Sequence, residues 1–382
     1  MNTVNVVDLA SDLIRTRSLS GQEDAMAQLV MQRMESLGYK DISVDANGSV
    51  LGFLGPRDEK LALLFDAHMD VVPVAGQWTV DPFGAQRING RLYGRGATDM
   101  KGALAAALCG AAQAAISGAL RQRVAVSASV LEEVIEGFAL SAVLDRCQPA
   151  AVVICEPSKL QVKVGQKGRQ EILLTLHGKP AHAALPHAGR NPIEDAATAL
   201  AALRTLALPS DDVLGSALLV PTDIISDPHP SISLIPSSVR IRFDRRTLSG
   251  ETVQFVMDAI EGCLREAGLE HFSLEIARDP VSTYTGHTIQ TPRDLPAWQL
   301  SPDHALVEAM CHAVRDAGRE PQVSTWWFCT NGSESAGRRG IPTVGLGPGR
   351  EEDAHTVDES IAIEQLEGAR DIYANLCLRL AG

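Results

Sequence analysis

Hydrophobic and polar positions follow one rhythm in the first part of the chain. Apolar residues recur at helical spacing over residues 5–17 and 22–37. Further along, short apolar runs alternate with helical stretches, and these runs cover residues 61–67, 123–131 and 150–155. Such alternation is typical of an α/β sheet. The alanine-rich stretch at 102–120 is too weakly hydrophobic for a membrane span, so we expect a buried helix there.

A different rhythm begins near residue 167 and continues to about residue 284. The pattern predicts the order strand, helix, strand, strand, helix, strand, at residues 171–177, 193–206, 216–225, 232–244, 251–267 and 272–277. This βαββαβ order is that of a ferredoxin-like plait. Beyond Thr285 the first rhythm returns, with a helix near 302–317, strands near 322–328 and 342–346, and a last helix from about 359.

The chain of 382 residues is longer than one hydrophobic core usually supports. Together with the two rhythms, this length predicts an α/β protein of two domains. We expect a discontinuous domain formed by residues 1–166 and 285–382, and an inserted α+β domain formed by residues 167–284.

Charge and cysteine content narrow the function classes. The formal net charge of −13 argues against nucleic acid or a membrane surface as a partner, because both would repel the chain, and it favours a small-molecule substrate. The seven cysteines are scattered without a CxxC motif, which suits free thiols in a reducing compartment. Residues 1–10 lack the charged start and apolar core of a signal peptide. These features predict a cytoplasmic protein.

Ionisable side chains follow the predicted strands at the point where each strand ends. His68 and Asp70 follow the first run, Glu132 and Glu133 the second, and Glu156 the third. Open α/β sheets place their ligand sites at this edge. Glu132 and Glu133 are adjacent and point apart, so one could bind a metal while the other takes a proton from water.

Two further residues complete a possible metal-ligand set. Asp99 follows a glycine-rich turn and precedes the alanine-rich helix, where it could either cap the helix or bridge two metal ions. His355 lies in a polar loop and, taken alone, could equally be a surface histidine. In the same way, His68 and Asp70 could be a core histidine and a turn residue, and Glu132, Glu133 and Glu156 could be solvated. Ligands so far apart in the sequence require a prefolded scaffold, unlike those of a zinc finger.

Ordered motifs over nearly the whole chain resemble the M20 family of dinuclear zinc peptidases and amidohydrolases. That family includes succinyl-diaminopimelate desuccinylase, acetylornithine deacetylase and glutamate carboxypeptidase. The motifs are AHMDVVP (67–73), GRLYGRGATDMKG (90–102), LEE (131–133), CEP (155–157), GKPAHAALPHAGRNPI (178–193), FDRR (243–246) and GPGREEDAHTVDE (347–359).

The resemblance implies a zinc-exopeptidase-like catalytic domain with a mixed sheet that holds two divalent metal ions. Zinc is expected, with cobalt or manganese as possible substitutes. It implies His68 and Glu156 on one metal, Glu133 and His355 on the other, and Asp99 as the bridge. Asp70 would orient His68. Glu132 would be the general acid/base that takes a proton from metal-activated water and returns it to the leaving amine.

The resemblance also implies roles for residues outside the ligand set. The inserted domain would be a dimerisation or lid domain, and the protein a homodimer formed through residues 167–284. His182 would reach across the dimer to stabilise the oxyanion, with domain closure. Arg246 would bind a substrate carboxylate, although it could also be a surface arginine. Asn331 and Gly332 lie where related enzymes have a substrate-contacting loop.

The substrate is left open. The segments GQKGRQEI (165–172), DRRTLSGET (244–252) and TNGSESAGRRGIPTVGLGPG (330–349) are most similar to a poorly characterised bacterial subgroup of M20 peptidases, the YgeY-like proteins. The desuccinylases have asparagine where this chain has Ser233, so succinyl-diaminopimelate is not carried over. We expect hydrolysis of an amide bond in an N-acyl amino acid or small peptide. A non-peptide C–N substrate on the same fold and a catalytically silent metal- or ligand-binding relative are the alternatives.

Overall fold

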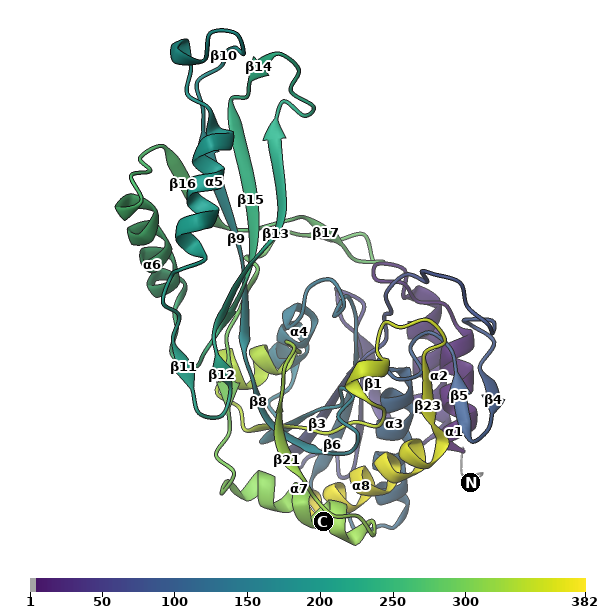
Figure 1. Cartoon of the computed structure of the whole chain (residues 1–382). Coiled ribbons are helices and arrows are strands. Elements are labelled where there is room, and N and C mark those ends of the chain that lie inside the picture. Colours follow the sequence, from purple (N-terminus) through teal and green to yellow (C-terminus); the bar gives the residue numbers. More distant parts are fainter. Residues whose placement is uncertain (1–4) are drawn as a thin grey trace. The chain divides into compact units, whose positions relative to one another are not determined.

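The computed structural model describes residues 5–382, which form two compact units (Figure 1). Unit 1 contains the residues up to Gln166 together with Pro280–Ile289 and Gln299–Gly382. Unit 2 contains Lys167–Asp279 and Gln290–Trp298. Each unit has its own cluster of buried apolar side chains. Among the described residues, no helix is both long and apolar enough to cross a membrane.

Unit 1 is a mixed sheet with helices. Its helical segments are α1 (Val6–Arg15), α2 (Asp24–Ser36), α3 (Lys101–Ile116), α4 (Phe138–Arg146), the π-helix η2 (Ser333–Arg338), α7 (Ala305–Asp316), the 3₁₀ turn η3 (Glu351–Asp353) and α8 (Ile363–Ala381). Its strands are β1 (Lys40–Val44), β2 (Val50–Leu54), β3 (Leu61–His68), β4 (Gln86–Ile88), β5 (Arg91–Tyr93), β6 (Arg123–Ser129), β7 (Ala151–Ile154), β8 (Val162–Gln166), β17 (Val281–Ser282), β18 (Thr288–Ile289), β21 (Val323–Trp326), β22 (Thr343–Gly345) and β23 (Ser360–Ala362), with β20 (Trp298–Gln299) at the boundary of the units.

The main sheet has the order β1-β2-β6-β3-β7-β22-β8-β20, with β21 beside β8. Strands β6, β3, β7 and β22 run parallel to one another. Their carboxyl ends therefore meet at one edge of the sheet. All eight residues of β3 are buried, as expected for a strand with neighbours on both sides and both faces covered.

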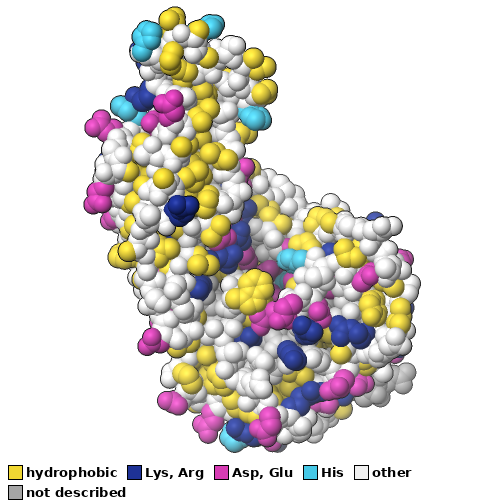
Figure 2. Space-filling model, in the orientation of Figure 1, with side chains coloured by type: hydrophobic (Ala, Val, Ile, Leu, Met, Phe, Trp, Pro, Cys, Tyr) yellow, Lys and Arg dark blue, Asp and Glu magenta, His cyan; other side chains and the backbone are white. Residues whose placement is uncertain are grey.

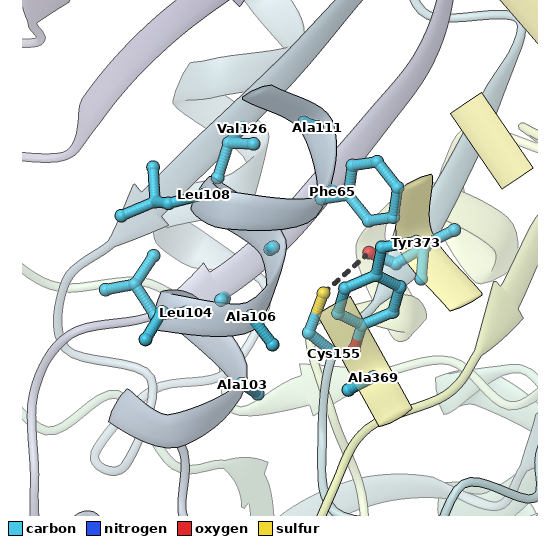
Figure 3. Close-up of a cluster of buried hydrophobic side chains, with 14 of the residues drawn as sticks. Phe65, Ala103, Leu104, Ala106, Leu108, Ala111, Val126, Cys155, Ala369 and Tyr373 are labelled. Carbon is cyan, nitrogen blue, oxygen red and sulfur yellow. Dashed lines mark hydrogen bonds between the residues drawn. The ribbon is translucent and has the colours of Figure 1, made fainter. Parts of the chain in front are cut away.

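Helix α3 packs against α8 inside the core of unit 1 (Figure 3). A Cβ atom at Gly110 would lie 2.5 Å from the carbonyl oxygen of Arg370, so the absence of a side chain permits this close approach. On α8, Tyr373 packs on Phe65 of β3, with 5.0 Å between ring centroids, and donates a 2.5 Å hydrogen bond to Leu346 O. This packing fixes β3 and the segment after β22 in the same core.

Unit 2 is an antiparallel sheet with two helices. Its helical segments are η1 (Pro186–Ala188), α5 (Pro192–Leu203) and α6 (Val253–Glu266). Its strands are β9 (Gly168–His177), β10 (Ala181–His182), β11 (Ser210–Asp211), β12 (Gly215–Ser216), β13 (Leu218–Asp227), β14 (Leu234–Ile235), β15 (Ser238–Thr247), β16 (Phe272–Ile276) and β19 (Asp294–Leu295). The long strands have the order β13-β15-β9-β16.

The element order of unit 2, β9-α5-β13-β15-α6-β16, agrees with the predicted βαββαβ pattern. The predicted insert and unit 2 both begin at residue 167, but the long segment of unit 2 ends at Asp279 instead of residue 284, and the chain later returns to unit 2 once more. Pro280–Ile289 belongs to unit 1, and Gln290–Trp298 returns to unit 2, where β19 pairs with β9.

Candidate metal centre

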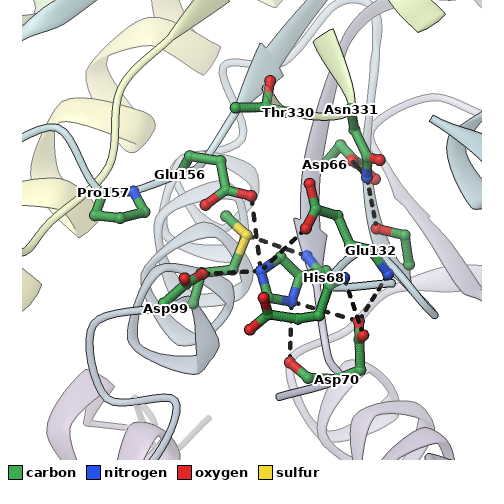
Figure 4. Close-up of polar contacts among 12 residues, drawn as sticks. Asp66, His68, Asp70, Asp99, Glu132, Glu156, Pro157, Thr330 and Asn331 are labelled. Carbon is green, nitrogen blue, oxygen red and sulfur yellow. Dashed lines mark hydrogen bonds and ion pairs between the residues drawn. The ribbon is translucent and has the colours of Figure 1, made fainter. Parts of the chain in front are cut away.

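The parallel strands deliver the predicted ligands to one edge of the sheet. His68 is the last residue of β3 and lies opposite Ser129, the last residue of β6. Glu132 and Glu133 follow β6 by a few residues, and Glu156 follows β7. In Figure 4 the ring of His68 lies between Asp99, Glu132 and Glu156. The structure thus brings together side chains from three separate strand ends.

Asp99 lies between two histidines, one on each carboxylate oxygen. Its Oδ1 is 3.0 Å from His68 Nε2, and its Oδ2 is 3.1 Å from His355 Nε2. His355 Nε2 is also 2.8 Å from Glu133 Oε2. On the other side, His68 Nε2 is 3.6 Å from Glu156 Oε1 and 4.0 Å from Glu132 Oε2. A carboxylate with one ligand group on each oxygen is suited to bridge two metal ions.

Two sets of ligand atoms are compact enough to hold a metal ion. They are His68, Asp99 and Glu133, and His68, Glu132 and Glu156, and within each set the atoms lie within 4.8 Å of one another. Oε1 of Glu132 and Oε1 of Glu133 are buried, and neither has a hydrogen-bond partner. Buried carboxylate oxygens without partners are costly, and a cation would remove that cost. The residues present therefore fit a metal site. Because both sets share His68, a second ion would need His355, which lies beside Asp99 Oδ2 and Glu133 Oε2.

The pKa values of this cluster reflect carboxylates crowded together in a buried place. Burial, followed by the charge of Glu156, raises the pKa of Glu132 well above its usual value. Burial and the charge of Asp99 raise the pKa of Glu156 well above its usual value and that of Glu133 to about 7. Crowded carboxylates with raised pKa values are typical of functional sites, including sites that bind a cation.

The pKa values of the two histidines are raised as well, which for a histidine favours the charged form. Burial lowers the pKa of His68, but its contacts with Asp70 and Asp99 outweigh this effect and raise it well above the usual value. Hydrogen bonds to Asp99 and Glu133 raise the pKa of His355 to about 10. Burial raises the pKa of Asp99, yet the two histidines hold it below its usual range.

The segment that carries His355 is packed directly against Glu156. A Cβ atom at Gly347 would lie 2.4 Å from Glu156 O, so only glycine permits this approach. The amide of Leu160 donates a 3.0 Å hydrogen bond to Gly347 O. Within the same segment Glu351 forms a 2.5 Å ion pair with the buried Lys163. These contacts explain why glycines precede the His355 loop.

Asp70 contacts more than the predicted histidine. His68 Nδ1 lies 3.0 Å from the main-chain oxygen of Asp70 and 3.5 Å from its Oδ1. The carboxylate of Asp70 accepts hydrogen bonds from the amides of Glu132 (3.1 Å) and Glu133 (3.2 Å), and from Ser20 Oγ (2.7 Å). Asp70 thus orients the ring mainly through its carbonyl and holds the acidic pair through its side chain.

The sequence analysis missed several buried carboxylates around the ligands. Glu359 accepts hydrogen bonds from the amides of Thr98 (2.9 Å) and Asp99 (3.1 Å) and pairs with Arg95 at 2.7 Å. Glu23, which is fully buried, accepts from the amide of Leu131 at 3.2 Å. Neither residue has a local sequence signal for this role, because the partner is far away in the chain.

The structure does not bring Asn331 and Gly332 into the cluster of ligands. Asn331 Nδ2 donates to Asp66 Oδ2 (2.7 Å) and Ser129 Oγ (3.2 Å), and Asn331 Oδ1 accepts from the amide of Gly137 (2.6 Å). Both residues are buried, and the Gly332 amide donates to Thr330 Oγ1. Asn331 therefore links β3, β6 and the loop after Glu133. Figure 4 shows it beside Asp66, and its substrate contact stays a prediction.

His182 and Arg246 lie in unit 2. His182 is exposed on β10, and its Nδ1 accepts a 3.0 Å hydrogen bond from the amide of Ala184. Arg246, on β15, forms two hydrogen bonds with the carboxylate of Asp244, at 2.7 and 3.1 Å. The roles predicted for both residues stay predictions.

Comparison with known families supports the resemblance seen in the motifs. Residues 64–379 match the model described as peptidase family M20/M25/M40. Protein YgeY of Escherichia coli strain K12, which is uncharacterised, is 29% identical over 375 residues, which is 96% of this chain and 92% of that protein. Succinyl-diaminopimelate desuccinylase of Thioalkalivibrio sulfidiphilus is 28% identical and covers 98% of this chain and 99% of its own length. The predicted family is confirmed.

Solved structures share the fold. An M20 family metallo-carboxypeptidase from Sulfolobus solfataricus superimposes with a TM-score of 0.79 at 20% identity, over 99% of both chains. The YXEP protein of Bacillus subtilis, described as a dinuclear metal binding peptidase of the M20 family, gives a TM-score of 0.69 at 16% identity, over 98% of this chain and 97% of its own. The predicted mixed-sheet α/β fold is confirmed.

Proposed function

Because the chain belongs to the peptidase family M20/M25/M40, a family of amide-bond hydrolases, we propose that it cleaves an N-acyl amino acid or a small peptide with two bound metal ions. The observation that carries this proposal is the position of Asp99, whose two oxygens face His68 and His355 separately. One metal would be held by His68 and Glu156, the other by Glu133 and His355, and Asp99 would bridge them. Mixed histidine and carboxylate ligation favours zinc, with cobalt or manganese as substitutes.

When bound, two divalent cations supply a Lewis acid that lowers the pKa of water and polarises an amide carbonyl. Glu132 is assigned the proton transfers. Its carboxyl is buried, its Oε1 has no hydrogen-bond partner, and its pKa is raised by burial and the charge of Glu156. A carboxylate with a raised pKa can accept a proton from the attacking water and then give it to the leaving amine. The Asp70 carboxylate fixes its backbone amide during both steps.

His182 is proposed to stabilise the oxyanion. Because its Nδ1 accepts a hydrogen bond from Ala184, the neutral ring carries its proton on Nε2, which leaves that atom free to donate. We propose that His182 of one protomer serves the site of its partner, so that activity requires a homodimer.

Support for a dimer through unit 2 comes from an exposed apolar surface on β13 and α5. Strand β13 lies at an edge of its sheet, and Ile224 and Ile225 on this strand are 54% and 40% exposed. Ile193 on α5 is 51% exposed. Hydrophobic side chains gather over this part of unit 2 (Figure 2). An apolar edge strand is a ready template for pairing with a second chain.

Arg246 is proposed to bind a carboxylate of the substrate. Its guanidinium is already oriented by the bidentate contact with Asp244, so less side-chain entropy is lost when a ligand binds. This role predicts that substrates with a free carboxylate are preferred, and that replacement of Arg246 by lysine raises KM more than it lowers kcat.

The test is the variant Glu132→Gln, assayed against a panel of N-acyl amino acids and dipeptides. The substitution removes the proton acceptor and keeps the shape of the side chain. We expect turnover to fall by about 10²- to 10⁴-fold while metal content is unchanged. Activity that survives in this variant would remove Glu132 from the mechanism. Wild-type protein with two bound metals and no turnover on any amide would favour a silent metal-binding relative instead.

The dimer is tested by mixing two inactive variants, Glu132→Gln and His182→Ala. If His182 acts across the dimer, a heterodimer of the two contains one site with both wild-type residues. We expect partial recovery of turnover in purified heterodimers. Heterodimers that stay inactive would contradict the assignment across the dimer without affecting that of Glu132.

A further inference from the structure

Three consecutive backbone amides in the acidic turn after β6 point at carboxylates. The amides of Glu132 and Glu133 donate to Oδ1 and Oδ2 of Asp70, at 3.1 and 3.2 Å. The amide of the preceding residue, Leu131, donates at 3.2 Å to Oε1 of Glu23. Figure 4 shows Asp70 and Glu132 in this arrangement. The main chain that carries the proposed base and a proposed ligand is thus anchored at three successive points.

Leu131 is the residue of this turn that most needs an anchor. Its φ of +58° lies in the left-handed region, which costs a branched side chain about 1–2 kcal/mol. Its side chain is 1% exposed, so water does not replace a lost hydrogen bond at its amide. Because Glu132 follows directly, the direction of the next two side chains depends on the backbone angles of Leu131.

Glu23 comes from the beginning of α2, more than a hundred residues away in the chain. It is 0% exposed, and its Oε1 also accepts a 3.0 Å hydrogen bond from the amide of Gly21. Its Oε2 has no hydrogen-bond partner in the described part of the chain. The side chain does not cap α2, although it stands at the N-cap position. The proposed chemistry does not use this buried carboxyl.

We propose that Glu23 is a positioning residue that holds Leu131 in its left-handed conformation. It would thereby direct Glu132 toward the attacking water and Glu133 toward the metal. This inference rests on the roles proposed above for those two residues. Glu23 acts through the acceptor oxygen Oε1, and together with Asp70 it fixes the turn from the side of α2.

The raised pKa of Glu23 agrees with a role in positioning the turn and not with a role in stabilising the fold. Burial, and next the charge of Asp70, raises the pKa of the Glu23 carboxyl to about 7. A buried carboxyl next to a second carboxylate, with one oxygen unpartnered, is a cost to the fold. The hydrogen bond from Leu131 offsets this cost by joining Glu23 to a distant part of the chain, whereas the hydrogen bond from Gly21 is local.

The experiment compares three substitutions at Glu23 in the full chain. Glu23→Gln keeps the Oε1 acceptor and removes the charge. Glu23→Asp keeps the charge and is a better helix cap, but its carboxylate is one methylene too short to reach Leu131. Glu23→Ala removes both the acceptor oxygen and the charge. Tyr39→Phe serves as the matched control, because it removes a buried 3.0 Å hydrogen bond to Leu108 O away from the site.

Two experiments are done on each variant. Zn²⁺ affinity is measured by competition with a chelating dye, and kcat and KM are measured on an N-acyl amino acid cleaved by the wild type. Of the two Zn²⁺ ions, we expect the more weakly bound one to lose about 10- to 100-fold in affinity in Glu23→Asp and Glu23→Ala. We expect kcat to fall by a similar factor, with KM unchanged. Glu23→Gln should resemble the wild type, and Tyr39→Phe should change only the melting temperature.

Contrary results fall into separable classes. If Glu23→Asp folds and keeps wild-type Zn²⁺ affinity and kcat, the inference is wrong, and Glu23 is only structural. If Glu23→Gln is as impaired as Glu23→Asp, the acceptor role is wrong, because a side chain that keeps the Oε1 acceptor would then not be sufficient. If the wild type itself does not bind Zn²⁺, the proposed function fails, independently of Glu23. Should Glu23→Ala not fold, Glu23→Asp carries the comparison.

Discussion

The two units arrange their charged side chains in opposite ways. In unit 1 four carboxylates, those of Asp99, Glu132, Glu133 and Glu156, converge on two histidines at a buried sheet edge. In unit 2 several charged side chains of the sheet pair with one another. Arg242 contacts Glu171 at 2.7 Å and Asp279 at 2.8 Å, and Arg246 contacts Asp244 at 2.7 Å.

The two regions differ in whether the protein itself pairs the charges of its carboxylates. In unit 2 each carboxylate just named has an arginine, so the charges satisfy one another at the surface. In the cluster of unit 1 the pKa values of Glu132, Glu133 and Glu156 are raised by burial and by their neighbours, and Oε1 of Glu132 and Oε1 of Glu133 have no hydrogen-bond partner. Arrangements of the second kind mark places where a ligand of opposite charge belongs.

The largest expected effect concerns metal addition to metal-free protein. Zn²⁺ at about a thousand times its dissociation constant should stabilise the wild type by about 4 kcal/mol, because it binds only the folded state. The variant Asp99→Ala should lose most of this gain, since it removes the bridge. Thermal unfolding over a series of Zn²⁺ concentrations measures the shift. Asp244→Ala in unit 2 is the control and should respond like the wild type; an equal response of Asp99→Ala would exclude the bridge.

The next effect is a pH dependence at Glu23. Its pKa is raised from 4.5 to about 7, by burial first and then by Asp70. The folded state therefore holds the proton more tightly, so this contribution to stability is fully present below pH 4.5 and is lost as the pH rises through about 7. Relative to the wild type, metal-free Glu23→Gln should gain up to about 3 kcal/mol over that range. Urea unfolding at several pH values tests this, and a constant difference would contradict the raised pKa.

A smaller effect is expected when one of the crowded carboxylates is neutralised. In metal-free protein, burial and the charge of Glu156 raise the pKa of Glu132, so the folded state holds that proton more tightly than the unfolded chain does. Glu132→Gln should therefore be more stable than the wild type by roughly 1–3 kcal/mol, although it is inactive. Unfolding by urea after chelation gives the comparison. A loss of stability would mean that Glu132 is satisfied without metal.

The smallest effect, with the opposite sign, is expected in unit 2. Glu171 pairs with Arg169 at 2.9 Å and with Arg242 at 2.7 Å near the surface. Glu171→Gln breaks both pairs and should destabilise the protein by about 0.5–1 kcal/mol, an effect that salt weakens. The same urea experiment at low and high salt measures it. Stabilisation by this substitution would erase the contrast between the two units.

That His68, Glu132 and Glu156 lie close together could be predicted, because strand ends are visible in the sequence. Apolar runs end at His68, near Glu132 and at Glu156, and parallel strands bring their ends together whatever the details of the core. The helices α1, α2 and α3 and the order of elements in unit 2 were also predictable from periodicity. Short or edge strands were not: β1, β2 and β8 went unpredicted, and residues 360–362, taken as the start of the last helix, form β23, which pairs with β5.

The supporting residues of the site lay beyond sequence reasoning for a physical reason. A hydrogen bond such as that of Glu23 to Leu131, or of Glu359 to Asp99, joins residues more than a hundred positions apart and leaves no periodic trace. The hydrogen bonds of Asn331 are likewise to residues far away in the chain. Its motif predicts substrate contact, whereas its amide is used to connect Asp66, Ser129 and Gly137.

The place of β22 in the sheet has a consequence for synthesis of the chain. This strand, Thr343–Gly345, lies between β7 and β8, both of which are made much earlier, and it leads directly to His355. A nascent chain that has not yet reached this strand contains Asp99, Glu133 and Glu156 but neither the second histidine nor a continuous sheet. Unit 1 therefore closes late in translation, and the cluster around Asp99 is complete only after the chain has grown past His355.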